Sequence, residues 1–265
     1  MKTLVLANQK GGVGKSAVAC QLAHYLAAQG KRVLVIDLDH QRNTSSALRK
    51  HARFAVAAFS SSAMLAGAAA ELPECPCVLI AGDEALSGLE RQLAQHNAYA
   101  NSIHSFVEEA VARFDVCVID TNPNPDIRYA VAMIVADFVL SPIQLNQEAL
   151  DGINGLLNHR RYGYNKINSA INPRLELIGL LPNLVEPTPF QKGNFLQLVQ
   201  QHAGLLIAMD GGAGRYAALA TRTAIAEAQA AGLYLGEMKK TSARDAFREM
   251  QPCLQTIVQR MALEA

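Results

Sequence analysis

A glycine-rich run near the start of the chain has the residue types that bind phosphate. It reads Lys10-Gly11-Gly12-Val13-Gly14-Lys15-Ser16. Glycines allow successive backbone N–H groups to turn towards phosphate oxygens, and a helix that follows adds the partial positive charge of its N-terminus. In such a loop the last lysine reaches the β- and γ-phosphates of a nucleotide, and the next hydroxyl is a ligand for Mg²⁺. The nucleotide-binding residues that we expect are Gly11, Gly12, Val13, Gly14, Lys15, Ser16 and Ala17.

Three aspartates stand at the ends of apolar runs further along the chain. Asp37 closes the run Arg32–Asp37, Asp39 follows two residues later, and Asp120 closes the run Val116–Asp120. Phosphoryl transfer needs positioning and charge neutralisation more than covalent chemistry, so a carboxylate beside Mg²⁺ and a pair of lysines is sufficient. Aspartate also has ordinary structural uses in such places, as a helix N-cap for Asp39 and as a turn residue for Asp120.

Short runs rich in valine, isoleucine and leucine recur between longer stretches with helical periodicity. Continuous apolarity predicts strands that are covered on both faces, whereas Ser16–Gln29 has a helical stripe that ends at Gly30. The repetition predicts an α/β fold, a mostly parallel, doubly wound sheet with helices on both faces. Ligands of such sheets bind beyond the carboxyl ends of the strands. The expected strands are Thr3–Ala7, Arg32–Asp37, Cys77–Ala81, Val116–Asp120, Phe138–Ile143 and Leu177–Leu181.

Length and charge exclude several classes of protein. The chain has 265 residues, of which 50% are hydrophobic, and a formal net charge of +1. This excludes a charged, disordered chain and a protein held to nucleic acid or lipid by bulk charge alone. The charge is segregated, because residues 1–60, 61–150 and 151–265 carry +7, −9 and +3. No linker-like composition divides the chain, so we expect one domain over residues 1–265.

The cysteines and the longest uncharged segment bear on location. Five cysteines are an odd number, and the apolar stretch before Lys10 is too short for a secretory signal. These features favour a cytoplasmic protein. The segment Phe54–Ala70 is mostly alanine with three serines and is too polar to span a membrane, so we expect a buried or half-buried helical segment there.

The glycine run departs from the ordinary phosphate loop. The ordinary pattern has a glycine five positions before Gly14, where this chain has Gln9, and an additional lysine, Lys10, begins the run. In this the chain resembles the ParA/MinD group of P-loop ATPases, whose loop is the deviant Walker A type. The resemblance covers most of the chain and is strongest over residues 1–50 and 114–150. It implies ATP and Mg²⁺ as cofactors and a homodimer in which Lys10 reaches the partner's nucleotide; a solvated loop lysine is the alternative reading.

The resemblance also implies roles for the aspartates. The run from Val35 to Asn43 is similar to the family's first switch, in which the second aspartate, Asp39, orients the attacking water. The run that ends at Asp120 resembles the Walker B element, whose aspartate holds Mg²⁺ through water. Asp37 is expected to support the metal shell. The predicted catalytic residues are thus Lys10, Lys15 and Asp39, and the predicted metal-binding residues are Ser16, Asp37 and Asp120.

Some residues depart from the family's switches. His40 and Arg42 stand where proline and glycine usually flank Gln41, and Asn122 stands in the second switch, where the family commonly has a double proline. These departures leave every predicted catalytic group in place. A further part of the resemblance is the loop that contains Pro182 and Asn183, which is expected to meet the adenine because an asparagine amide pairs with a base edge. A plain turn asparagine is the alternative.

Basic residues in the last third of the chain are candidates for DNA contact. Family members that partition DNA bind it without sequence preference when ATP drives dimerisation, and lysine or arginine contacts to phosphates suit that behaviour. The glycine run begins at residue 10, so we expect DNA binding to use the ATPase domain rather than a helix-turn-helix. An ordinary solvated basic face is the alternative. The candidates are Arg160, Arg161, Lys192, Arg215, Arg222, Lys239 and Lys240.

The resemblance therefore implies a DNA partition ATPase that is cytoplasmic, and nucleoid-associated when bound to ATP. Mg·ATP would drive formation of a sandwich homodimer that binds non-specific DNA, and slow hydrolysis, stimulated by a ParB-like partner, would release it. One alternative is a positioning ATPase for another cargo, such as cellulose-synthesis or flagellar machinery. Another is a small-molecule kinase or synthetase on the same loop.

Other classes of protein that share this phosphate loop fit the sequence less well. Membrane recruitment of the MinD kind needs a basic amphipathic C-terminal helix, and the segment after Cys253 carries one base, Arg260. The cysteines lack the spacing of iron–sulfur or zinc sites, and no histidine pair has the spacing of a zinc hydrolase. We expect no membrane partner and no metal bound by cysteine.

Overall fold

The computed structural model describes residues 1–146, 149–209 and 214–263, and the side chains of residues 149–151 are left out of the description. Its centre is a seven-stranded sheet in the order β3-β4-β2-β5-β1-β6-β7. Every neighbouring pair of these strands is parallel. The strands are β1 (Lys2–Leu6), β2 (Val33–Asp37), β3 (Ala55–Val56), β4 (Cys77–Ile80), β5 (Val116–Asp120), β6 (Phe138–Ile143) and β7 (Glu176–Pro182).

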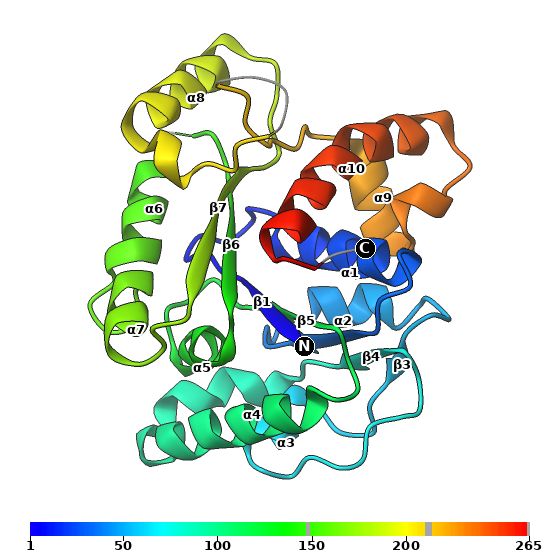
Figure 1. Ribbon diagram of the computed structural model, residues 1–265, viewed down its shortest axis with the longest axis vertical. Coiled ribbons are helices and arrows are strands. Elements are labelled where there is room, and N and C mark those ends of the chain that lie inside the picture. The colour runs from blue at the N-terminus through cyan, green and yellow to red at the C-terminus, as the bar shows by residue number, and fades with distance from the viewer. Residues whose placement is uncertain (147–148, 210–213, 264–265) are drawn as a thin grey trace.

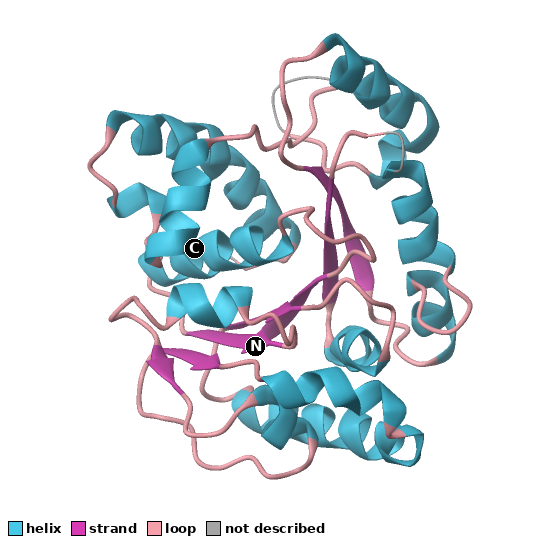
Figure 2. Ribbon diagram, turned by 180° about the vertical axis from the view of Figure 1, so that it is seen from behind, coloured by secondary structure: helices cyan, strands magenta, loops and turns pink. Residues whose placement is uncertain are grey.

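Helices cover both faces of the sheet, as Figures 1 and 2 show. Helices α1, α2, α9 and α10 lie on one side, and α3, α4, α5, α6 and α7 lie on the other (Figure 1). The helices are α1 (Lys15–Ala28), α2 (Asn43–Leu48), α3 (Ser61–Leu65), α4 (His96–Ala110), α5 (Ile127–Val135), α6 (Ala149–Asn158), α7 (Tyr164–Ala170), α8 (Pro189–His202), α9 (Thr223–Ala231) and α10 (Thr241–Arg260). Single 3₁₀ segments lie at η1 (Glu84–Arg91), η2 (Leu93–Gln95), η3 (Ala203–Leu205) and η4 (Leu235–Glu237).

The alternation of side chains along the strands divides the core into two clusters. In β1, Leu4 and Leu6 pack with Val18 of α1 and Leu254 of α10, whereas Val5 packs with the opposite cluster. Successive residues of a strand point to opposite faces, so a strand that is apolar throughout contributes to both clusters. The predicted doubly wound α/β fold is therefore confirmed.

Six of the seven strands are the predicted ones, and the limits of each agree within one residue. The exception is β3 (Ala55–Val56), which lies in the segment that we expected to be helical. The helical prediction for Phe54–Ala70 is wrong except for the five residues of α3. Ser60 caps α3 by accepting a hydrogen bond from the N–H of Ala63, and the chain turns away at Gly67, where φ is +77°. The alanines that follow are exposed and have no apolar surface to cover, so the helix does not extend.

Two further expectations concern the chain as a whole. That residues 1–265 form one domain stays a prediction, and part of that range lies outside the described residues. Within the described ranges, none of the helices combines the length and the apolarity that crossing a bilayer needs. All five cysteines are free thiols, and four of them are buried.

Candidate functional site

Three neighbouring strands carry the predicted site residues to one edge of the sheet. The glycine run follows β1, Asp37 ends β2 and Asp120 ends β5, and these strands are adjacent in the order β2-β5-β1. In register, Leu6 pairs with Asp120, and Asp120 pairs with Asp37. Because all three strands are parallel, their carboxyl ends meet at the same edge. A cleft of about 520 Å³ opens there between the glycine run and α2.

The conformation of the loop explains two of its glycines. Gly12 and Gly14 have φ values of +76° and +86°, in the left-handed region that residues with a Cβ adopt at a cost. At Gly14 a Cβ would also lie 2.2 Å from Nδ2 of Asn183. The loop then passes directly into α1, whose first residue is Lys15. The sequence therefore has glycine where the backbone must turn to expose its N–H groups.

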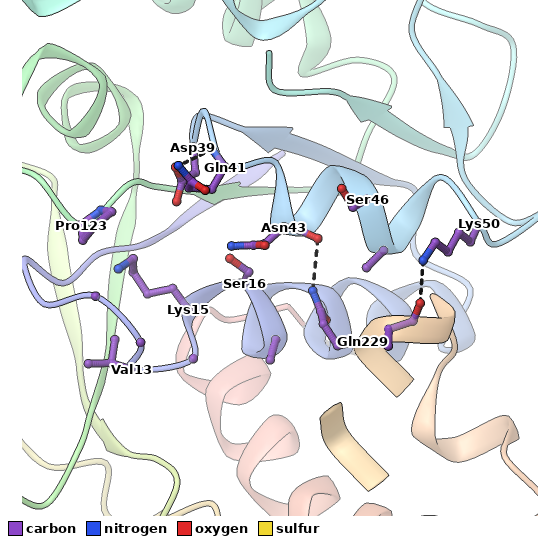
Figure 3. A pocket seen from close by; sticks show the side chains of 16 residues that line it. Val13, Lys15, Ser16, Asp39, Gln41, Asn43, Ser46, Lys50, Pro123 and Gln229 are labelled. Carbon is purple, nitrogen blue, oxygen red and sulfur yellow. Dashed lines mark hydrogen bonds between the residues drawn. The ribbon is translucent and has the colours of Figure 1, made fainter. Parts of the chain in front are cut away.

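Lys15 lies in the cleft with its ammonium group held by the loop itself. Its Nζ donates to the carbonyl oxygens of Asn8 and Lys10 at 3.1 and 3.3 Å. Burial lowers the pKa of Lys15, and the nearby carboxylates of Asp120 and Asp39 oppose this. A buried ammonium whose only described partners are carbonyl oxygens is suited to an anionic ligand, which would satisfy it better. In Figure 3, Lys15 and Ser16 face Asp39, Gln41 and Asn43 across the cleft.

Asp120 has one carboxylate oxygen without a partner. Its Oδ2 accepts a hydrogen bond from Oγ1 of Thr44 at 2.7 Å, and the Ser16 hydroxyl interacts with the same carboxylate. Oδ1 is buried and accepts no hydrogen bond from any of the described residues. Burial raises the pKa of Asp120 to about 6. An unpaired buried carboxylate oxygen beside a serine hydroxyl is the donor set of a divalent-cation site, so these residues fit the predicted metal.

Asp37 accepts hydrogen bonds from the loop that follows β2. Its Oδ2 accepts from the N–H and hydroxyl of Ser45 at 2.8 and 2.6 Å, and its Oδ1 accepts from the N–H of Asp39 at 3.0 Å. Burial, and then the charge of Asp120, raise the pKa of Asp37 to about 7. These hydrogen bonds hold the loop after β2 in place, and the part of Asp37 in the metal shell stays a prediction. Thr44, whose hydroxyl donates to Asp120, was not selected by the sequence reasoning.

Asp39 lines the cleft beyond the end of β2. Its Oδ1 accepts a hydrogen bond from the N–H of Gln41 at 3.0 Å, and the residue is 6% exposed. Helix α2 begins only at Asn43, with Arg42 as its N-cap residue, so Asp39 is not a cap of that helix. Asp39 is placed where it could orient a water molecule in the cleft, and this role stays a prediction.

Lys10 lies half-buried at the start of the loop. Its N–H donates to Oδ1 of Asn8 at 2.8 Å, and its carbonyl accepts from Lys15. The side chain does not contribute to the wall of the cleft that Lys15 lines. Within one chain, Lys15 therefore lines the cleft and Lys10 does not.

Asn183 forms a hydrogen bond with the backbone of the glycine run. Its Nδ2 donates to the carbonyl of Val13 at 2.8 Å, and its N–H donates to the carbonyl of Ile143 at 2.7 Å. Neither Asn183 nor Pro182, which are both buried, lines the cleft. The adenine contact predicted for these two residues stays a prediction. The structure shows instead that the Asn183 side chain holds the loop by its hydrogen bond to Val13.

Several residues of the site were missed by the sequence reasoning. The far end of the cleft is lined by Lys50 of the segment after α2 and by Gln229 of α9. Gln229 donates to the carbonyl of Asn43 at 3.3 Å, and Lys50 donates to the carbonyl of Ala230 at 2.6 Å (Figure 3). No local pattern marks these residues, because α9 reaches the cleft only through packing against α1 and α2.

The predicted DNA contacts do not form one cluster in a single chain. Arg160 and Arg161 lie between α6 and α7, whereas Arg222, Lys239 and Lys240 flank α9 and α10 on the other side of the molecule (Figure 1). All seven candidates, which also include Lys192 in α8 and Arg215, are exposed.

Three of these basic residues have acidic partners within the chain. Arg222 pairs with Glu249 at 2.6 Å, Lys240 with Glu227 at 2.7 Å and Arg161 with Glu90 at 3.6 Å. Exposed ion pairs of this kind are weak because water and salt screen them, so they can open readily when a phosphate competes for the basic residue.

Comparison with known proteins relates the chain to one family and to solved structures of the same fold. The family described as "AAA domain" matches residues 1–177. The chain is 32% identical to the protein IncC of Escherichia coli, over 99% of this chain and 71% of IncC. It is 33% identical to the chromosome partitioning protein ParA of Caulobacter vibrioides, over 68% of each protein. Among solved structures, an ATP complex of a McdA variant from Cyanothece has a TM-score of 0.78 at 20% identity and covers 100% of this chain and 98% of that one, which shows a common fold.

Proposed function

The chain belongs to the ParA/Soj/IncC family of partition ATPases, and on this premise we propose that it is an ATP-dependent DNA partition ATPase. The observation that carries the proposal is the cleft beyond β1, β2 and β5. There a buried lysine, Lys15, lies near a buried carboxylate, Asp120, that has one oxygen without a partner. This pair is suited to a phosphate group and a divalent cation at once.

The residues of the chain divide the work of binding ATP and Mg²⁺. Gly11 to Ala17 direct N–H groups at the phosphates, and Lys15 exchanges the carbonyl oxygens of Asn8 and Lys10 for phosphate oxygens. Ser16 and Asp120 hold the metal, and Thr44 keeps the Asp120 carboxylate in position. Mg²⁺, when bound by these residues, would neutralise the negative charge of the phosphates.

Hydrolysis and dimerisation depend on two further residues. Asp39 orients the attacking water, since its carboxylate lines the cleft and is itself fixed by the N–H of Gln41. Lys10 lies outside the cleft of its own chain and contacts the nucleotide of the second subunit in an ATP-bound homodimer. The dimer brings together two sets of basic residues that are dispersed in one chain, so that DNA binding depends on ATP. Slow hydrolysis, stimulated by a ParB-like partner, releases the DNA.

Co-sedimentation with DNA tests this function. The purified protein should sediment with random-sequence DNA in Mg·ATP at low salt and remain in the supernatant in Mg·ADP. Binding should weaken steeply with salt, because each phosphate contact releases a counterion. No ATP-dependent binding at low salt would contradict the partition function.

Substitution of the basic residues refines the same test. The double variant Lys239→Ala/Lys240→Ala should bind DNA more weakly and lower the slope of log K against log salt by about 4, because the dimer loses two lysine contacts in each subunit and each contact accounts for about one unit. Arg91→Ala, an exposed arginine outside the candidate set, is the matched control and should bind as the wild type does. An unchanged slope in the double variant would remove these two lysines from the interface.

A positioning ATPase for another cargo is the second candidate. The dispersion of the seven candidate basic residues favours it, because they do not gather on one face of a single chain and three of them have acidic partners. ATP-dependent dimerisation without ATP-dependent DNA binding would support this candidate over the first.

A further inference from the structure

Two loops at the carboxyl end of the sheet are joined by a buried arginine. Arg128 lies in the first turn of α5, and its side chain is 4% exposed. It forms an ion pair with Asp126, in which Nε lies 3.2 and 3.1 Å from the two carboxylate oxygens and Nη2 also donates. The remaining group, Nη1, lies 3.0 Å from Nδ1 of His40. The contact spans 88 residues of sequence and connects the loop after β5 with the loop after β2.

The chemistry of the contact fixes the direction of the hydrogen bond. Arginine only donates, so Nδ1 of His40 must accept. The carboxylate of Asp126 compensates the charge of the buried guanidinium, which leaves Nη1 directed at His40 alone among the described residues. Nδ1 of His40 lies 3.4 Å from Oδ1 of Asp39, the next residue. Both of these atoms are acceptors, so the coupling runs through the backbone: an arrangement that fixes His40 limits the movement of Asp39, the residue joined directly to it.

Asp126 extends the connection to the second loop. It caps α5 by accepting from the N–H of Arg128 at 3.0 Å, and it accepts from Nδ2 of Asn122 at 2.9 Å. Asn122 is fully buried and lies two residues after Asp120. A continuous series of contacts thus runs from Asp39 through His40, Arg128 and Asp126 to Asn122.

We propose that Arg128 and His40 are positioning residues, which set the carboxylate of Asp39 and couple the loop that follows β2 to the loop that follows β5. The proposal rests on the proposed ATPase function, since Asp39 is the residue that orients the water. Neither residue lines the cleft. They act by limiting the movement of Asp39, and a displacement of about 1 Å in such a group can lower a rate by about a hundredfold.

Variants at His40 test the proposal without disturbing the buried ion pair. His40→Leu removes the acceptor, and His40→Asn keeps an oxygen acceptor near the position of Nδ1. In the nucleotide-free protein, His40→Leu should speed amide hydrogen exchange over residues 38–43, and His40→Asn should leave it near the wild-type rate. In ATP hydrolysis, His40→Leu should lower kcat by about tenfold to a hundredfold, with the Kd for ATP changed by less than about threefold. His40→Asn should recover most of kcat.

Arg128→Gln provides the second variant, and Arg113→Gln is its matched control. Arg113 is also partly buried and donates to the carbonyls of Leu72 and Pro73, far from the cleft. Arg128→Gln should lower kcat as His40→Leu does, whereas Arg113→Gln should leave kcat unchanged. Wild-type exchange and kcat in His40→Leu, or equal loss of kcat and ATP affinity, would overturn the proposal. A wild-type protein that hydrolyses no ATP would instead contradict the proposed function, and the exchange measurement would still test the coupling.

Discussion

At the scale of single residues, the site contains ionisable side chains whose charged forms are disfavoured by burial. Lys15, Asp37 and Asp120 are all buried beside the carboxyl ends of three adjacent strands. Burial lowers the pKa of the lysine and raises the pKa of both aspartates. Each shift disfavours the charged form, so a ligand that carries phosphate and a cation would relieve all three.

Alanine variants of Lys10 and Asp39 are expected to lose different properties. Lys10→Ala should bind ATP but lose ATP-dependent dimerisation, because the proposed role of Lys10 is contact with the partner's nucleotide. Asp39→Ala should dimerise with ATP yet hydrolyse it about a hundredfold more slowly or worse, because the water is no longer oriented. Size-exclusion chromatography with ATP and phosphate release measure the two properties. The exposed Lys166→Ala is the control, and a Lys10→Ala variant that dimerises and turns over normally would refute the role in trans.

Arg42 carries backbone strain next to the site. Its φ of +59° lies in the left-handed region, where a residue with a Cβ is disfavoured by about 1 kcal/mol. Arg42→Gly should therefore raise the free energy of unfolding by about 0.5 kcal/mol, since the relief of strain exceeds the extra flexibility of glycine in the unfolded chain. Arg49→Gly at the other end of α2, where φ is −61°, is the control and should lose about 0.5–1 kcal/mol. Urea denaturation of the wild type and the two variants measures these free energies of unfolding. Equal losses of stability in both variants would exclude strain at Arg42.

At the scale of elements, the cleft depends on how α9 packs against α2. Gly232 ends α9 with a φ of +70° and lies directly against the segment of Ala47 and Lys50. A Cβ at this position would lie 2.3 Å from the carbonyl oxygen of Ala47. The glycine therefore permits both the left-handed turn and the close approach, which together bring Gln229 to the end of the cleft.

Gly232→Ala should destabilise the protein by about 1–3 kcal/mol, because it adds a left-handed alanine and a steric clash with backbone. It should also weaken ATP binding, since α9 must move away from α2. Gly193→Ala in α8, where a Cβ meets nothing within 4 Å, is the control and should stabilise by about 0.5–1 kcal/mol. Thermal denaturation and fluorescent-nucleotide titration measure both effects. If the two alanine variants behaved alike, the close contact would not be a determinant of the packing.

At the scale of the whole molecule, stability depends on pH through buried groups far from the cleft as well as within it. His24 of α1 is 1% exposed, and its Nδ1 has no hydrogen-bond partner among the described residues. It packs against the rings of His51, Phe54 and Tyr234, which joins α1 to the segment after α2 and to η4. Burial, and then the neighbouring His51 and Arg53, lower the pKa of His24 to about 3.

The wild-type protein should therefore lose stability in acid through His24. Its pKa in the folded state lies below the unfolded value of about 6.5, so the folded state binds fewer protons. The contribution of neutral His24 to the free energy of unfolding is fully present above about pH 6.5 and is lost as the pH falls towards 3. Asp37 and Asp120, whose pKa values are raised, act in the opposite direction, so a variant is needed to isolate the histidine.

His24→Leu, of similar volume, provides that comparison. Between pH 7 and pH 5 the wild type should lose about 1–2 kcal/mol more than the variant, from 1.4 kcal/mol per pH unit over the interval in which only the unfolded histidine is protonated. Chemical denaturation at both pH values measures the difference. Parallel losses in the two proteins would mean that His24 does not control the acid limb.

The sequence by itself determined the sheet, the phosphate loop and the strand-end aspartates, because each depends on a local pattern. Apolar runs predict buried strands, and glycines before Lys15 and Ser16 predict a loop that turns around phosphate. Only the tertiary structure decided how the side chains are used. Asp37 accepts hydrogen bonds from Ser45, Asn183 donates to the carbonyl of Val13, and Arg128 donates to His40. The last two contacts join residues 88 or more positions apart, and such contacts arise from the packing of whole elements, which no local pattern encodes.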